Sequence, residues 1–221
     1  MAAATAALMM SACAATAPLE VGKETGANHE SDQELYEAGF TNLRSFRSAV
    51  ARVQTELYDG AWVVDQYGAV PTSMNCAGAV PGYGFDLDRS FTGGTFELSQ
   101  APDELVAWLR AEGWRAAGVS VRDTVDAGSG VTVVRAGGSP DGLVRLLYVS
   151  YYEATQSVLL NAESECFVGD QRRLTTMIFP DDSALIRPIY PETELPGEEP
   201  IFRFSLADGN AYNVLDEYSD E

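Results

Sequence analysis

Two cysteines that lie far apart in the chain constrain its fold more than any other feature. Cys76 falls in a turn-rich stretch, and Cys166 directly precedes Phe167. Almost everything with the pattern of a folded core lies between them. A third cysteine, Cys13, stands apart in an apolar N-terminal run. The role of Cys13 therefore decides whether Cys76 and Cys166 remain as a pair.

The N-terminal residues 1–12 carry no charge and consist largely of alanine and methionine. An apolar run that is too short to span a bilayer and ends in small residues is typical of a signal peptide. Met10-Ser11-Ala12-Cys13 resembles a bacterial lipobox. The resemblance implies a lipoprotein signal peptide over 1–12 and a mature N-terminus at Cys13. Cys13 would carry a diacylglycerol, with palmitate among the acyl chains, and two chains suffice for stable anchoring.

One feature of the leader departs from this pattern. A signal peptide opens with Lys or Arg, whereas the first basic residue of this chain is Lys23. An alanine-rich N-terminus with an incidental cysteine is the alternative. Residues 13–30 show no periodicity and are predicted to form a flexible tether. The single histidine, His29, falls in this tether, and the sequence offers it no metal co-ligands or nucleophile.

The net charge of −19 argues against nucleic acid as a partner. Phosphate binding needs a Lys/Arg surface, so nucleic acid is not expected as a partner. Residues 181–221 hold eleven acids against two arginines and are rich in proline. We expect this acidic tail either to wrap around the domain or to stay solvated, with a short hairpin over 201–215. Residues 31–180 are predicted to form one domain.

Two helices are expected before the main run of strands. Ser31 is a good N-cap, and an apolar stripe follows it to a stop near Asp59-Gly60. Arg44, Arg47 and Arg52 are predicted to lie off this stripe, on a solvated face. A second helix is expected from Pro102 to a left-handed cap at Gly113. The apolar stripe of the first helix comprises Tyr36, Phe40, Leu43, Phe46, Val50, Val53 and Leu57.

The remaining pattern has the period of strands. Residues 143–152 are apolar on both faces, which indicates an inner strand, and short connections between successive strands imply a meander. We therefore predict an α+β fold: a mostly antiparallel sheet of about four to six strands with two helices on one face. The other predicted strands are 62–64, 83–88, 95–98, 119–125, 131–135 and 156–163.

No catalytic or cofactor motif stands out. Gly118–Arg122 lacks the last glycine of a nucleophile elbow, and the glycine-rich turn 137–142 lacks the lysine of a phosphate loop. Asp86 and Asp88 share one face of a strand, so they could bind a cation or act as acid and base. The polar face of an ordinary strand is the simpler interpretation. We thus expect no catalytic, metal-binding or cofactor-binding residues.

With Cys13 assigned to lipid, Cys76 and Cys166 form an even pair that brackets the core. In an exported protein such a pair is a disulfide candidate. Closing a loop of about 90 residues would stabilise the fold by roughly 4–5 kcal/mol in the chain-entropy model. Two buried free thiols are the alternative.

These features together are similar to a known family. The chain resembles actinobacterial secreted lipoproteins of the LppA-like group. The features that carry the resemblance are a lipobox, an N-terminal amphipathic helix, a mid-chain cysteine, a meander ending at Cys166-Phe167 and a proline-rich acidic C-terminal segment. The resemblance implies a location on the extracytoplasmic face of the cell membrane. It implies no catalytic residues.

The expected function is that of a membrane-anchored envelope lipoprotein that acts as a binding or interaction module. Its partner would be an envelope protein or a small-molecule ligand, bound on the other sheet face or in the groove beside the second helix and Tyr151/Tyr152. An envelope hydrolase that uses Asp86 or Asp88 is one alternative. A purely structural envelope protein is another.

Overall fold

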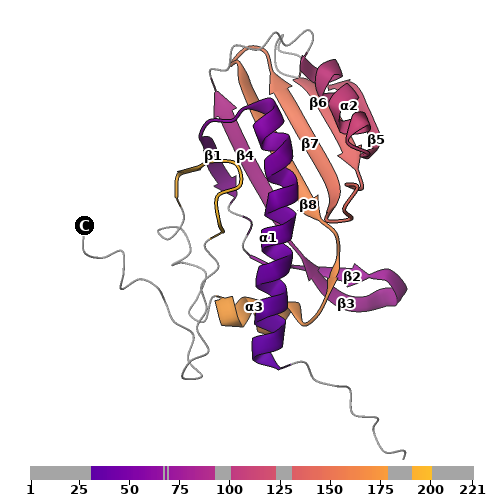
Figure 1. Cartoon of the computed structure of the whole chain (residues 1–221), viewed down its shortest axis with the longest axis vertical. Helices are drawn as coiled ribbons and strands as arrows, with labels where there is room; N and C mark the ends of the chain where they lie inside the picture. The colour runs from indigo at the N-terminus through magenta and orange to yellow at the C-terminus, as the bar shows by residue number, and fades with distance from the viewer. Residues whose placement is uncertain are drawn as a thin grey trace, which may run out of the picture. The chain divides into compact units, whose positions relative to one another are not determined.

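The computed structural model describes residues 31–66, 68, 70–92, 101–122, 131–178 and 191–200 (Figure 1). Several predictions fall outside these residues: the leader, Cys13, the tether with His29, the strand 95–98 and the hairpin 201–215.

The main sheet has seven strands in the order β10–β1–β4–β8–β7–β6–β5, and every neighbouring pair is antiparallel. Strands β5 to β8 form the predicted meander, and β8 lies at the centre of the sheet. The α+β, mostly antiparallel fold is therefore confirmed. The strands are β1 (Trp62–Gln66), β4 (Asp86–Thr92), β5 (Arg115–Arg122), β6 (Val131–Gly137), β7 (Val144–Tyr152), β8 (Ser157–Ser164) and β10 (Thr193–Glu194).

The long helix α1 (Asp32–Leu57) begins at a complete capping box. The Glu34 backbone N–H donates to Ser31 Oγ at 3.2 Å, and the Ser31 N–H donates to Glu34 Oε2 at 2.8 Å. These two bonds satisfy donors that a helix start otherwise leaves open. Helix α2 (Ala101–Ala111) is followed by Gly113 at a φ of 86°, the left-handed conformation that glycine adopts most readily. Both predicted helices are confirmed.

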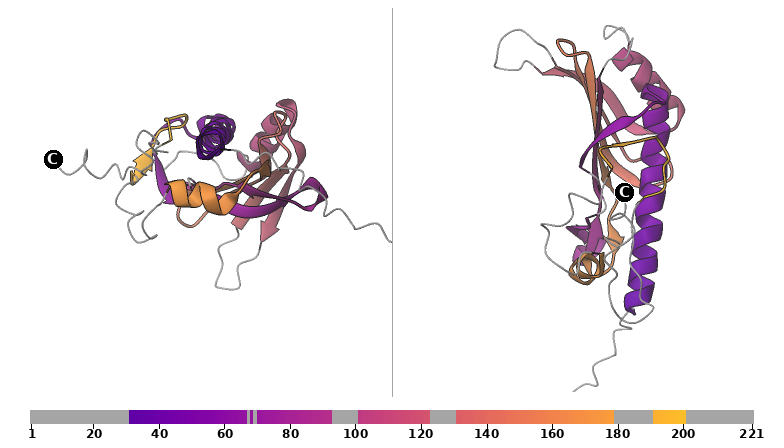
Figure 2. Two further views of the ribbon diagram at one scale, coloured as in Figure 1. Left: turned by 90° about the horizontal axis from the view of Figure 1, so that it is seen from below. Right: turned by 90° about the vertical axis from the view of Figure 1, so that its left-hand side faces the viewer.

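Both helices cover the same face of the main sheet, as predicted (Figures 1 and 2). Leu43, Phe46 and Val50 of α1 are fully buried there. A register shift between Val144 and Leu146 breaks the alternation of β7, so Val144 is buried together with Leu147. This bulge explains why the start of β7 is apolar on both faces.

A second, three-stranded sheet has the order β2–β3–β9, with β2 (Thr72–Cys76), β3 (Val80–Gly84) and β9 (Phe167–Val168). The stretch predicted as turn-rich is thus largely a hairpin, which turns through the short helix η1 (Ala77–Ala79). A third helix, α3 (Gln171–Ile178), follows β9. The sequence did not predict this sheet or this helix.

The disulfide Cys76–Cys166 joins the hairpin to the end of the main sheet, across a sequence separation of 90 and a Cα–Cα distance of 5.4 Å. The predicted bond is therefore confirmed. Gly82 lies against it: a Cβ at this position would stand 2.5 Å from the Cys76 sulfur and 2.5 Å from the Phe167 carbonyl oxygen. Real atoms do not approach so closely, so the bond requires glycine at position 82.

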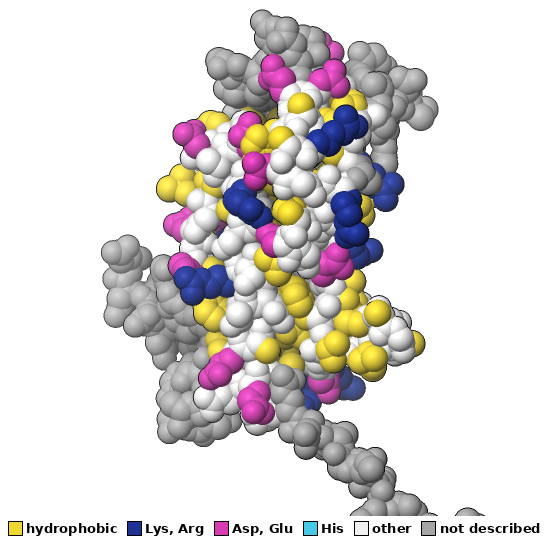
Figure 3. Space-filling view, turned by 45° about the vertical axis from the view of Figure 1, so that its right-hand side comes forward, with side chains coloured by type: hydrophobic (Ala, Val, Ile, Leu, Met, Phe, Trp, Pro, Cys, Tyr) yellow, Lys and Arg dark blue, Asp and Glu magenta, His cyan; other side chains and the backbone are white. Residues whose placement is uncertain are grey.

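The second sheet carries no charged residue in any of its three strands. Val80 and Val168 are 41% and 67% exposed. Figure 3 shows hydrophobic side chains gathered where the β2–β3 hairpin projects, at the lower right of that view. Acidic and basic side chains are scattered over the rest of this face among uncharged ones (Figure 3).

Part of the acidic tail packs against the domain. Strand β10 pairs with the edge strand β1, with Glu194 opposite Trp62, and Glu194 and Pro200 are buried. This contact covers a second side of α1, and Arg47 lies beneath it with only 6% of its surface exposed. The prediction that Arg47 lies on a solvated face was wrong for this reason. Arg44 and Arg52 are exposed, as expected.

Candidate functional site

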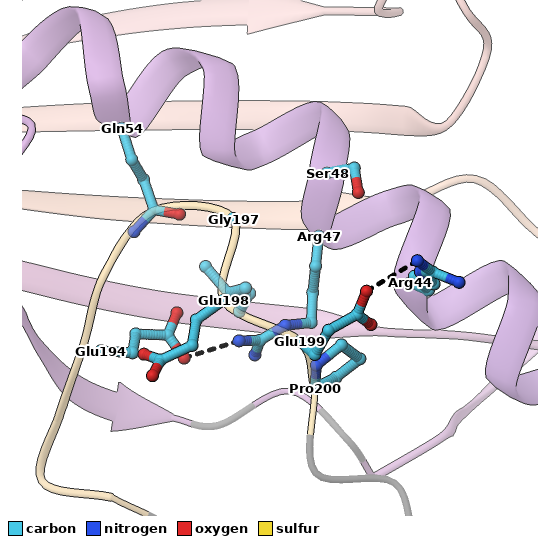
Figure 4. Close-up of a pocket in the computed structure, with 10 residues that line it drawn as sticks. Arg44, Arg47, Ser48, Gln54, Glu194, Gly197, Glu198, Glu199 and Pro200 are labelled. Atoms are coloured by element: carbon cyan, nitrogen blue, oxygen red, sulfur yellow. Dashed lines mark hydrogen bonds and ion pairs between the residues drawn. The ribbon is translucent and has the colours of Figure 1, made fainter.

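Three arrangements of side chains could carry chemistry, and the first is a buried ionic cluster. Glu194 Oε2 accepts from Arg47 Nη2 at 2.6 Å (Figure 4). Glu194 Oε1 accepts from Arg89 Nε, also at 2.6 Å. Arg47, Arg89 and Glu194 are 6%, 0% and 5% exposed. Arg89 Nη1 also donates to the Asp88 carbonyl oxygen at 2.7 Å. The cluster joins α1, β4 and the acidic tail.

The pleat of β4 places Arg89 in the core. Leu87, Arg89 and Phe91 alternate along the strand and are all buried, so Arg89 points toward the helices between two apolar side chains. A charge in such a position is tolerated only when it is paired and hydrogen-bonded. Glu194 meets this need, and its two oxygens are shared between two arginines.

A small polar cavity adjoins the cluster, with a volume of about 20 Å³. Gln54 lines it, is 2% exposed, and has no hydrogen-bond partner for its Nε2 among the described residues. A volume of this size holds a single water molecule and no organic group. The cluster therefore holds α1, β4 and the acidic tail together, and it is not a ligand pocket.

The second arrangement contains the predicted carboxylates, which lie on the sheet face that points away from the helices. Asp86 stands opposite Glu163 of β8. Burial raises the pKa of the Asp86 carboxyl, and the negative charge of Glu163 raises it further. Asp88 accepts a hydrogen bond from Asn161 Nδ2 at 2.7 Å, and Glu163 is paired with Arg145.

This second group forms the polar face of two neighbouring strands. Neither Asp86 nor Asp88 lines the cavities described for this molecule. The structure therefore brings Asp86 together with a carboxylate that the sequence did not single out, Glu163, on an open surface.

The third arrangement is a cavity of about 160 Å³ between α1 and α2. The sheet contributes its floor, and the facing ends of the two helices contribute its walls. Five of the eight residues that line it are apolar, and the other three have polar side chains. The cavity is lined by Glu56 and Leu57 of α1, Ala101, Glu104 and Leu105 of α2, and Phe91, Tyr151 and Val158 of the sheet.

Tyr151 is the polar group at the base of this cavity, and it is 2% exposed. Burial raises the pKa of its phenol, and the nearby charge of Glu104 adds to the shift. Like an ordinary tyrosine, the phenol is protonated at neutral pH, and it can both donate and accept a hydrogen bond.

The sequence predicted a groove beside the second helix at Tyr151 and Tyr152, and Tyr151 does line such a cavity. Tyr152 does not, because alternation along β7 turns it to the other face of the sheet. The rim residues Glu56 and Glu104 were not expected to belong to a site. An inward-facing arginine between Leu87 and Phe91 was the signal that could have revealed the ionic cluster.

Comparison of the chain with family models, curated proteins and solved structures finds no match. The described helices include none with the length and apolar character needed to cross a membrane. Among the described residues, no group of three or more His, Cys, Asp or Glu side chains is arranged to hold a metal ion.

Proposed function

We propose that this protein is a lipid-anchored lipoprotein of the cell envelope that binds a small ligand in the cavity between α1 and α2. The cavity is the observation that supports binding. An apolar pocket with a few convergent polar groups, one of them with a shifted pKa, is the arrangement typical of a ligand site.

The volume of the cavity sets the size of the ligand. Drug-sized ligands occupy roughly 300–1,000 Å³, and an apolar cavity of roughly 150 Å³ accepts benzene. At about 160 Å³, this cavity suits a group the size of one aromatic ring.

The ligand site can be tested with methyl resonances of the whole chain carrying Cys13→Ser. Ring-sized fragments are expected to shift the methyl signals of Leu57, Leu105 and Val158. Ala101→Phe, which fills the cavity from α2, should abolish these shifts. Ala111→Phe places the same ring on the exposed far end of α2 and should leave them intact. Shifts that survive Ala101→Phe would contradict the proposal.

The anchor is a separate part of the proposal, supported by the lipobox-like residues 10–13 and by a disulfide of the kind that persists in oxidising compartments. Metabolic labelling of the native precursor with a fatty-acid probe is expected to label the protein through Cys13. Label that persists in Cys13→Ser would show that the anchor is wrongly assigned.

The hydrolase alternative has one supporting observation, the raised pKa of Asp86. A general acid must also face a bound substrate. Asp86 instead lies on an open strand face, and Asp88 is held by Asn161. The geometry therefore favours binding over hydrolysis.

A further inference from the structure

Two carboxylates stand at the rim of the cavity between α1 and α2. Glu56 belongs to the last turn of α1 and Glu104 to the first turn of α2. Both side chains are exposed and both line the cavity. In the described part of the chain, neither forms an ion pair. Five acids of the described residues do form ion pairs with arginines, namely Asp32, Asp141, Glu163, Glu194 and Glu199. In this part of the chain, other exposed acids, such as Asp65 and Asp103, form none, so the cavity itself is what sets Glu56 and Glu104 apart.

The interior of the cavity differs in character from its rim. Leu105 and Val158 line the cavity and are 3% and 1% exposed, so its inner end is made by core residues. The cavity thus presents an apolar interior below a negative entrance. A ligand complementary to both parts has an apolar body and a positive charge at one end.

We propose that the cavity binds an organic cation, a primary amine attached to an apolar group the size of one aromatic ring. This inference rests on the proposed ligand-binding function and adds the chemical class of the ligand. The ring would lie against Phe91, Leu105 and Val158, and the ammonium group would lie between Glu56 and Glu104. The net charge of −19 favours the approach of cations from a distance.

An organic cation fits this entrance better than a metal ion. Calcium takes about six to eight oxygen ligands, whereas the rim supplies two carboxylates above an apolar interior. An ammonium group needs only three acceptors, and it brings an apolar body that the interior can bury.

Benzylamine, benzyl alcohol and benzoate test this proposal because they share one ring and differ mainly in charge. The measurement is a titration of the Leu57, Leu105 and Val158 methyl resonances in the whole chain carrying Cys13→Ser, at neutral pH and low salt. Benzylamine should bind roughly tenfold more tightly than benzyl alcohol, since each rim contact resembles an exposed ion pair. Benzoate should bind most weakly.

Two variants distinguish the effect of the rim charge on affinity from the effect of the rest of the cavity. Glu104→Gln should lower the ratio of benzylamine to benzyl alcohol affinity roughly threefold. Glu37→Gln makes the same charge change on α1 roughly 28 Å from Glu56 along the helix, and should change neither affinity. A ratio of amine to alcohol affinity that is near one, or that Glu104→Gln does not alter, would overturn the ligand class. If none of the three compounds shifts the methyl signals, the ligand-binding function itself is wrong.

Discussion

Glu194 shares the acidic tail with Glu198 and Glu199, but its surroundings differ from theirs. Glu199 pairs with Arg44 at the surface, where both side chains are more than half exposed. The carboxylate of Glu194 is buried between two arginines. The same residue type therefore has two very different energetic roles within six residues of chain.

Glu194→Gln is expected to destabilise the domain by about 3–5 kcal/mol, because it removes the carboxylate charge that two buried guanidinium groups share. Glu199→Gln removes an exposed pair and should cost less than about 1 kcal/mol. Urea unfolding of both variants gives the two free energies. Similar losses for the two would show that the buried cluster contributes no more than a surface pair.

Asp86→Asn is expected to raise the free energy of unfolding at neutral pH. The folded-state pKa of Asp86 lies above the ordinary value of 3.8, so ionisation disfavours the folded state. This penalty is absent below 3.8 and grows as the pH rises through the folded-state pKa. The gain should therefore disappear in acid. It should stay below about 1 kcal/mol, because solvent screens the half-buried group.

Denaturant unfolding at several pH values measures this gain. Asp65→Asn, at an exposed position of β1, is the control for the loss of one negative charge. A stabilisation by Asp86→Asn that persists at the lowest pH would contradict the assignment to ionisation.

Among the elements, those with strong local signals could be predicted from sequence. Ser31 and Glu34 determine the start of α1, and Gly113 determines the end of α2, because capping depends on nearby residues only. The meander follows from short connections. The β2–β3 hairpin of the second sheet was missed because its strands are rich in polar, glycine and proline residues, which are typical of turns. Strand β9 was missed because it pairs with β3 across a long stretch of sequence, and such a pairing leaves no local pattern.

Only part of the candidate site could be predicted, because some of its residues meet through contacts between distant parts of the chain. Tyr151 shows an apolar, inward pattern along β7, so its burial could be predicted. Glu56 and Glu104 are ordinary polar residues of their own helices, and only the packing of α1 beside α2 brings them to one cavity. The pairing of Arg47 with Glu194 likewise depends on where the tail returns, which no helical periodicity encodes.

Loss of the disulfide is expected to destabilise the second sheet and the domain to which it is joined. Replacing both Cys76 and Cys166 with serine should lower the free energy of unfolding by roughly 4–5 kcal/mol in the chain-entropy model. Thermal unfolding of the oxidised wild type, the reduced wild type and the double variant measures this loss. The reduced wild type should match the double variant. A change below about 1 kcal/mol would show that the hairpin holds its place without the bond.

For the molecule as a whole, residues 191–200 of the tail pack as part of the folded domain. A chain that ends at residue 190 lacks Glu194 and should lose at least as much stability as Glu194→Gln. Arg47→Met combined with Arg89→Met should restore part of it in that shortened chain, because apolar side chains of similar size replace buried ion clusters well.

Calorimetry of the shortened chain with and without the two methionines tests this prediction. Failure of the methionines to restore any stability would mean that contacts other than Glu194 hold the tail. The result also matters for experiments that search for a binding partner. If a partner no longer binds after removal of the tail, the loss indicates binding by the tail only when the remaining domain is still folded.

The cluster of Arg47, Arg89 and Glu194 also fixes the order in which this molecule can mature. The chain leaves the ribosome N-terminus first, and 147 positions separate Arg47 from the carboxylate that neutralises it. Until Glu194 has been synthesised, Arg47 and Arg89 therefore lack the carboxylate that both contact in the folded domain.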